Sequence, residues 1–265
     1  MYFNSFKPSI SYIIKCKQSI IEHASIQQSY LNDEEIIMIG LVYIRCDYRK
    51  FGFGEFLTNY LFNIKSKEIN TIHANILIEH IPFYIRYGFK RSFSLIGSIG
   101  RLNQINNINI SIDDDIIIDL YESSNINHIA IYDNSIYPIN HIKFFEKLRG
   151  NISSIAGYVA RSKKTNLIKG YIILNFSRLF IKCGPLYADN ISIALLLLKC
   201  CAYHYDGIML LSVPETNPHA IQLFKSNHFK QTDILHRVYK GNQLFFNQSI
   251  FQRILAIRDD WFSFI

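Results

Sequence analysis

Apolar and polar positions follow two patterns along the chain, one typical of buried strands and one typical of amphipathic helices. Residues 10–46 contain three apolar runs rich in β-branched residues, which predict three successive strands, with the clearest turn signal at "LNDEE". Downstream, apolar residues recur at the spacing of one helix face, which predicts a helix over residues 52–65. This face consists of Phe56, Leu57, Tyr60, Leu61 and Ile64.

The alternation of strand and helix continues and then recurs in the second half. A strand at 71–78, a short helix at 80–88 with Gly88 as its C-cap, and a strand at 89–97 are expected next. Residues 103–128 are polar and Asn-rich, with one candidate strand at 115–121. Further strands are expected at 154–162, 168–176, 178–188, 207–213 and 229–241, and helices at 139–149, 189–205 and 217–227. The order strand, helix, strand, helix, strand therefore occurs twice, which indicates an internal duplication of one α/β unit.

The composition narrows the class of partner. The chain has 265 residues, of which 49% are hydrophobic, so it can bury a substantial core, and its formal net charge is +7. A positive charge favours anionic partners such as nucleic acid, a membrane face or a phosphorylated cofactor. No run of five or more Lys and Arg residues occurs, and no nucleic-acid module is recognisable, so we do not expect nucleic acid as the partner.

Cysteine usage and apolar segments indicate a cytoplasmic protein without a metal. The five cysteines are odd in number and form no C-x-x-C pair, so neither a zinc cluster nor a disulfide framework is indicated, and reduced thiols are expected. No signal peptide is recognisable at the start of the sequence. The most apolar helix candidate is interrupted by Lys199 and is too short to span a bilayer, so no membrane partner is expected.

The stretch "YRKFGFGEF", residues 48–56, joins a strand to a helix through a basic turn with two glycines. Gly52 and Gly54 would let a ligand approach the backbone, and the first helical turn favours a phosphate, to which Arg49 and Lys50 add charge. A P-loop is absent, and Leu57 stands where a dinucleotide fingerprint needs its third glycine. The alternative is a tight turn that binds nothing.

In context, "IGLVYIRCDYRKFGFGEFL" followed by "FYIRYGFKRS" resembles the GNAT superfamily of N-acetyltransferases. There an R/Q-x-x-G-x-G/A turn carries the pyrophosphate of acetyl-CoA. The preceding V-x-P-x-Y-R pattern is matched by Ile44, Cys46, Tyr48 and Arg49, with cysteine in place of proline. The resemblance implies acetyl-CoA as co-substrate and Tyr84, in "YIRYGF", as the acid that protonates the departing thiolate. The residues implied in cofactor binding are Ile44, Cys46, Arg49, Lys50, Phe51, Gly52, Phe53 and Gly54.

The second half is similar to the "domain 18" acetyltransferase type that forms the C-terminal half of some tandem GNAT proteins. "GPLYADNISIALLLL" and "LLSVPETNPHAIQLF" carry this resemblance, and Asp189 or Asn190, and Asn217 followed by Pro218, are expected to begin helices. The likeness extends from about residue 12 to 241 and leaves 242–265 unaligned. It implies two GNAT-like units, 1–105 and 106–265, each a mixed, mostly antiparallel sheet with a central parallel strand pair flanked by helices, the first shortened at its start.

Comparison of the two halves indicates that acetyl-CoA binding and catalysis belong to the first half. The helix start "YADNISIA" has neither glycine nor basic residue, and Asp189 would repel a pyrophosphate. Phe224 stands at the tyrosine position and His228 at the glycine position, and phenylalanine has no proton to give. The second half is therefore expected to be non-catalytic and to shape the acceptor pocket.

The resemblance implies transfer of an acetyl group from acetyl-CoA to an amine of a small molecule or protein. Tyr84 would be the acid, and Glu79 and His80 lie where they could relay the amine's proton through water. Each of these residues has a structural alternative: Tyr84 could be a core aromatic residue, Glu79 could cap a helix, and His80 could be a surface histidine. The rival function is a CoA-binding sensor or interaction protein without turnover. The acceptor and the oligomeric state do not follow from the residues.

Overall fold

The structure is a computed structural model of the chain, and it describes residues 10–16, 19–31, 34–65, 71–107, 114–136, 145, 154–242 and 248–257. Its contacts divide the chain into two compact units. The first unit comprises Met1–Ser92, His236–Leu244 and Asp259–Ile265, and the second comprises Phe93–Leu235 and Phe245–Arg258. Each unit therefore combines segments from distant parts of the sequence.

In its described residues, the first unit has a five-stranded sheet with helices on one face. Its strands are β1 (Ile10–Cys16), β2 (Ser19–Leu31), β3 (Glu34–Ile44), β4 (Thr71–Ile76) and the end of β11 (Lys230–Gly241), side by side in that order. Its helices are α1 (Phe53–Lys65) and α2 (Ile81–Arg86), with 3-10 turns η1 (Cys46–Tyr48) and η2 (Ile78–His80) before them. The pair β3 and β4 is parallel, and the other pairs are antiparallel.

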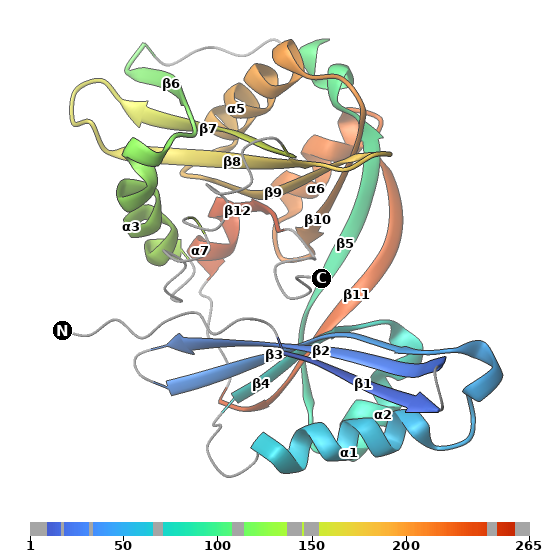
Figure 1. The fold of residues 1–265 in the computed structure, drawn as a ribbon. Helices are drawn as coiled ribbons and strands as arrows, with labels where there is room; N and C mark the ends of the chain where they lie inside the picture. The colour runs from blue at the N-terminus through green and yellow to red at the C-terminus, as the bar shows by residue number, and fades with distance from the viewer. Residues whose placement is uncertain are drawn as a thin grey trace. The chain divides into compact units, whose positions relative to one another are not determined.

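The helices cover this sheet because side chains of alternate strand residues point to the same face. From β4, Ile72, Ala74 and Ile76 belong to one buried cluster with Leu57 of α1 and Tyr84 of α2. Figure 1 shows both helices on the same side of β3 and β4. The glycine expected to end α2 does so: Gly88 follows the C-cap with a φ of 82°, a left-handed conformation that glycine adopts at little cost.

The second unit has a larger mixed sheet. Beside the start of β11 lie, in order, β5 (Lys90–Arg101), β10 (Ile208–Pro214), β9 (Ile181–Ala188), β8 (Ile168–Phe176), β7 (Ile155–Ser162) and β6 (Ile116–Leu120). A further short strand, β12 (Ile254–Ala256), pairs with β9. The helices are α3 (Ile126–Ile136), α5 (Ile191–His204), α6 (Pro218–Ser226) and α7 (Gln248–Arg253), with 3-10 turns η3 (Leu102–Asn107) and η4 (Ser123–Asn125).

Helices cover both faces of the second sheet. Ile172 and Leu174 of β8 lie in the buried cluster that contains α5 and α6, whereas Tyr171, which precedes Ile172, faces the other way. On that opposite face, the Tyr171 hydroxyl donates a hydrogen bond to Asp133 of α3, and the ring packs edge-to-face on Tyr132. Figure 1 shows α5 and α3 on opposite sides of β8. The sheet is therefore the middle layer of three.

Each sheet takes a strand from the other half of the sequence. Residues 95–101 of β5, which follows α2, pair with β10 in the second unit. Residues 236–241 of β11, which follows α6, pair with β4 in the first unit. The predicted division of the chain into two successive GNAT-like units, residues 1–105 and 106–265, stays a prediction.

Several predicted elements are confirmed, and three helices or strands were not anticipated. Asn190 caps α5 and Asn217 caps α6, with Pro218 at the first helical position, as expected. The helix α3 was not predicted, although the apolar residues on its buried face recur every three or four positions: Ile126, Ile129, Tyr132 and Ile136. The helix α7 and the strand β12 were not predicted either. The helix predicted at 139–149 lies outside the described residues, apart from Phe145, which is helical.

In the described parts of the chain, no helix has both the length and the apolar character needed to cross a membrane.

Candidate active site

The central parallel strands of the first unit pair over only part of their length. Residues 36–39 of β3 are in register with residues 71–74 of β4, and the register ends there. Beyond that point β3 continues to Ile44 and β4 to Ile76. Strands that separate in this way leave backbone N–H and C=O groups that another partner must satisfy. The opening between β3 and β4 is therefore a place where a polar, extended ligand can bind.

The basic turn follows β3 and η1 and favours glycine at one position. Lys50 and Gly52 both have left-handed backbone conformations, with φ of 69° and 83°. An added Cβ at Gly52 would meet no atom within 4 Å, so the backbone conformation, rather than crowding, favours glycine there. The Gly52 carbonyl accepts the first helical hydrogen bond of α1, from the Phe56 N–H at 2.9 Å.

The first backbone N–H groups of α1 have no hydrogen-bond acceptor within the helix, as at every helix start. They belong to Phe53, Gly54 and Glu55, and the positive end of the helix dipole lies with them. The neighbouring cations are accessible: Lys50 is exposed, and exposed Arg49 donates from Nε to the Ile44 carbonyl at 3.0 Å. The turn can therefore offer an anion backbone donors and positive charge together.

A cavity of about 210 Å³ lies between the starts of α1 and α2. Four residues predicted for the site line it: Ile44, Gly54, His80 and Tyr84. Three further lining residues were not predicted: Glu55, Thr58 and Phe83. The other predicted residues are not part of its lining: Cys46, Arg49, Lys50, Phe51, Gly52, Phe53 and Glu79. The folded chain thus brings the β3 end, the glycine turn and the tyrosine around one space.

Tyr84 lies between the buried core and this cavity. Its side chain is 7% exposed and packs edge-to-face on Phe89, with ring centroids 5.2 Å apart. Burial raises the pKa of Tyr84 to about 12, so the phenol carries its proton at neutral pH. Within the described part of the chain, its hydroxyl has no hydrogen-bond partner. A protonated hydroxyl at a cavity wall is available to donate to a bound ligand.

The two candidate bases are placed differently. His80 ends η2, is exposed and lines the cavity. Glu79, one residue earlier, is also exposed but does not line it. Another carboxylate, Glu55, does line the cavity, and it accepts a hydrogen bond from the Tyr87 hydroxyl at 2.9 Å. His80 and Glu55 are therefore the titratable groups nearest to the cavity besides Tyr84.

The unpredicted lining residues left only a weak signal in the sequence. Gly54 and Thr58 are four residues apart on α1, so they share a helix face, and Thr58 is a buried polar residue. Glu55 follows the second glycine of the turn, and Phe83 precedes the tyrosine. Spacing alone does not tell which helix faces meet across a cavity, because that depends on how α1 and α2 pack.

No metal site is indicated in the described residues, which contain no group of three or more His, Cys, Asp or Glu side chains that could hold an ion. Of the histidines in the first unit whose burial the structure describes, His73 on β4 is the most deeply buried, at 4% exposed. Burial, and secondarily the charge of Arg237, lower its pKa to about 3. His73 is therefore a neutral side chain of the sheet interior at physiological pH.

The second unit repeats the end of α2 with other residues. At the end of α6, the N–H of Phe229 donates to the Phe224 carbonyl at 3.0 Å, as that of Phe89 donates to the Tyr84 carbonyl at 3.2 Å. His228 has a φ of 61°, the left-handed conformation that Gly88 adopts in the first unit. Phe224 therefore occupies the structural position of Tyr84, without a hydroxyl group.

The start of α5 also differs from that of α1. The Asn190 side chain accepts a hydrogen bond from the Ile193 N–H at 3.0 Å, so the helix start already has an acceptor. Asp189 precedes it and adds negative charge where α1 has a basic turn. These features argue against anion binding at the start of α5.

Residues 130–251 match the family model described as an acetyltransferase (GNAT) domain. No sequence among curated proteins matches the chain.

Solved structures share the fold over most of the chain. A provisionally assigned acetyltransferase from Pyrococcus horikoshii aligns with a TM-score of 0.69 at 16% identity, over 91% of this chain and 76% of its own. A tandem GNAT protein from the clavulanic acid biosynthesis pathway aligns with a TM-score of 0.66 at 10% identity, over 90% and 84%. A GCN5-related N-acetyltransferase from Sphaerobacter thermophilus gives 0.58 at 11% identity, over 87% and 79%. The resemblance and the fold class expected from the sequence are confirmed.

Proposed function

Because residues 130–251 match the GNAT acetyltransferase domain family and the chain as a whole has the GNAT fold, we propose that this protein is an N-acetyltransferase that uses acetyl-CoA. The acceptor is an amine of a small molecule or of a protein. The observation that carries the proposal is the cavity of the first unit, where the opening of β3 and β4, the glycine turn and a protonated tyrosine meet. The second unit takes no part in the chemistry.

Binding of the co-substrate is assigned to the turn. Backbone N–H groups from Phe51 to Gly54 hold the pyrophosphate, with Arg49 and Lys50 supplying positive charge. Phe51 of this turn is 73% exposed, and Gly52 is exposed as well. The strand N–H groups near Ile44 to Cys46 hold the thioester carbonyl and stabilise the negative charge that develops on its oxygen.

The chemical step needs one proton donor and one acceptor. The amine nitrogen attacks the thioester carbonyl carbon, an amide C–N bond forms and the C–S bond breaks. Tyr84 donates its proton to the leaving thiolate, and its raised pKa keeps that proton in place until the sulfur becomes negative. The proton lost from the amine passes to His80, or through water to Glu79. His80 is the better placed of these two, because it lines the cavity.

Titration calorimetry with acetyl-CoA tests the proposal. The unaltered protein should bind with micromolar affinity, and Gly52→Val should weaken binding at least tenfold, because valine does not adopt a φ of 83° without strain. The matched control is Gly241→Val. Gly241 also has a positive φ, 91°, and belongs to the first unit, but it pairs with Thr71 at the other end of β4.

The outcomes separate the rival functions. Loss of binding in Gly52→Val with retention in Gly241→Val supports the turn as the cofactor site. If acetyl-CoA does not bind to the unaltered protein, "YRKFGFGEF" is a tight turn without a ligand, and the proposal is wrong. Binding without release of free thiol in the presence of any tested amine would favour a CoA-binding protein that does not turn over.

A further inference from the structure

The parallel strands of the second unit also separate, but the gap between them holds a strand of the same chain. β9 and β10 pair at only two positions, Met209 with Ile181 and Leu210 with Lys182. Beyond them, β12 pairs antiparallel with β9, Ile254 opposite Tyr187 and Ala256 opposite Leu186. The segment formed by α7, β12 and Ile257, residues 248–257, is called the C-terminal segment below.

The same segment also bonds to the other side of the gap. Ile257 donates to the Ser212 carbonyl of β10 at 2.8 Å and accepts from the Ser212 N–H at 3.3 Å. The backbone groups that the two diverging strands would leave unpaired are thus bonded to the C-terminal segment on both sides. In the first unit, the corresponding opening begins beyond Ile39 and Ala74.

Burial shows that the segment is part of the core of the second unit. Ile254, Leu255, Ala256 and Ile257 are each between 0% and 3% exposed. Leu255 and Ala256 belong to the main hydrophobic cluster, together with residues of β8, β9, α5 and α6. Phe251 is 9% exposed and packs edge-to-face on Phe93 of β5, with ring centroids 5.0 Å apart.

A buried asparagine ties the segment to α6. Asn217 is 1% exposed, and its Nδ2 lies within 3.0 Å, 3.2 Å and 2.9 Å of the carbonyl oxygens of Phe251, Gln252 and Ile254. Its Oδ1 accepts from the Ala220 N–H at 3.0 Å and caps α6. One side chain therefore satisfies both the helix start and the carbonyls at the bend from α7 into β12.

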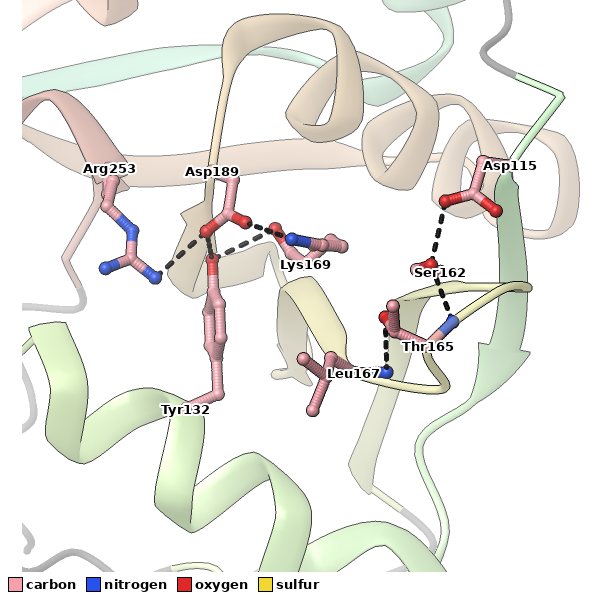
Figure 2. A network of polar contacts seen from close by, with 8 residues as sticks. All are labelled: Asp115, Tyr132, Ser162, Thr165, Leu167, Lys169, Asp189 and Arg253. Atoms are coloured by element: carbon pink, nitrogen blue, oxygen red, sulfur yellow. Dashed lines mark hydrogen bonds and ion pairs between the residues drawn. The ribbon is translucent and has the colours of Figure 1, made fainter.

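Charge complementarity continues at the start of α5 (Figure 2). The Arg253 guanidinium lies 2.9 Å from Asp189 Oδ1, and Lys169 Nζ lies 3.4 Å from Asp189 Oδ2. The Tyr132 hydroxyl, 3.0 Å from Asp189 Oδ1, completes the group, and Arg253 stacks over the Tyr132 ring. Where the first unit has a basic turn, the second has a carboxylate with two cations beside it. One of them, Arg253, comes from the C-terminal segment, and the other, Lys169, comes from β8.

We propose that the C-terminal segment is a permanent intramolecular occupant of the second unit's cleft, and that it excludes acyl-CoA from that cleft. That the excluded ligand is acyl-CoA rests on the proposed function, whereas the occupancy itself does not. A segment tethered to its own site acts at a millimolar effective concentration, so micromolar free ligand does not compete with it. Hydrogen bonds, apolar burial and charge all match the segment to this cleft.

Hydrogen–deuterium exchange on the full chain tests this inference. The amides of residues 254–257 should exchange slowly in the free protein and remain as slow at saturating acetyl-CoA. Asn217→Ala should speed their exchange at least tenfold, because three carbonyls lose their donor. The matched control is Asn227→Ala: Asn227 is 7% exposed at the end of the same helix, and its Nδ2 donates to Leu223 at 2.7 Å rather than to the segment. This control should leave the exchange of 254–257 unchanged.

Three results would overturn the inference: rapid exchange of 254–257 in the unaltered protein, faster exchange there on adding acetyl-CoA, or equal behaviour of the two asparagine variants. Should Asn217→Ala not fold, Arg253→Ala on the segment itself replaces it, with the same tenfold expectation and the same reversal if exchange is unchanged. If acetyl-CoA binds nowhere, the proposed function fails, and the free-protein and variant measurements still decide whether the segment occupies the cleft.

Discussion

At the scale of single residues, the two units differ by one hydroxyl group at the equivalent positions of Tyr84 and Phe224. Tyr84 and Phe224 occupy the same place in the same helix ending, and the next turn carries Gly88 in one and His228 in the other, both left-handed. The aromatic ring is retained in both because it fills the core between helix and sheet. Only Tyr84 presents a proton to a cavity, so the difference concerns chemistry rather than packing.

The Tyr84→Phe variant should therefore lose rate and retain binding. We expect kcat to fall about 10²-fold, within the range of general-acid effects, while the acetyl-CoA Kd from calorimetry changes less than about threefold. Because burial raises the pKa of Tyr84 to about 12, its proton should not limit the rate of the unaltered enzyme below about pH 11. Tyr87→Phe is the matched control, since that hydroxyl bonds to Glu55. A rate equal to that of the unaltered protein in Tyr84→Phe would contradict the role as acid.

At the scale of elements, the close approach of two long strands depends on glycine. An added Cβ at Gly97 of β5 would lie 2.4 Å from Thr232 Oγ1 and 2.9 Å from the Asp233 carbonyl of β11. At Gly100 an added Cβ would meet the Phe229 ring at 2.5 Å. These two glycines let β11 and Phe229, the residue before it, lie against β5. On its other side β5 pairs with β10.

The Gly97→Ala variant should destabilise the protein, because the clash with the Asp233 backbone cannot be relieved by a side-chain rotation alone. A loss of about 1–3 kcal/mol is expected, the usual range for overpacking. The shift of the urea midpoint measures it. Ser92→Ala on the same strand is the control, since it removes an atom instead of adding one. An unchanged midpoint for Gly97→Ala would show that β5 and β11 lie farther apart than described.

At the scale of the whole molecule, the features that bear on function are divided between the two compact units. The cavity, the basic turn and Tyr84 belong to the first unit, and the C-terminal segment belongs to the second. The formal net charge of +7 favours an anionic ligand such as the pyrophosphate of acetyl-CoA.

The protein should bind one acetyl-CoA per chain. Calorimetric titration measures this stoichiometry directly, and acetyl-CoA at about 100 times its Kd should stabilise the native state by about 2.7 kcal/mol, visible as a raised Tm. At the same concentration, the Gly52→Val variant should show a smaller rise in Tm, because its affinity is at least tenfold weaker. Two equivalent sites per chain would contradict both the assignment of the turn and the occupancy of the second cleft.

Much of the local structure and part of the candidate site were predictable because their causes are local. The helix α1, its glycine turn and the caps Asn190 and Asn217 follow from periodicity and from the conformations that these residues favour. The position of Tyr84 followed from a short motif. The lining residues Glu55, Thr58 and Phe83 did not, because their meeting depends on how two helices pack.

The sequence alone thus determined most of the segments that become strands and helices, where the basic glycine turn lies, and which half carries the tyrosine. These properties depend on residues that are neighbours along the chain. The tertiary structure alone decided that β11 joins β4, that β5 joins β10, and that β12 fills the gap between β9 and β10. The alternation of a strand shows which face it buries but not which strand it pairs with, and that choice depends on contacts between residues far apart in sequence.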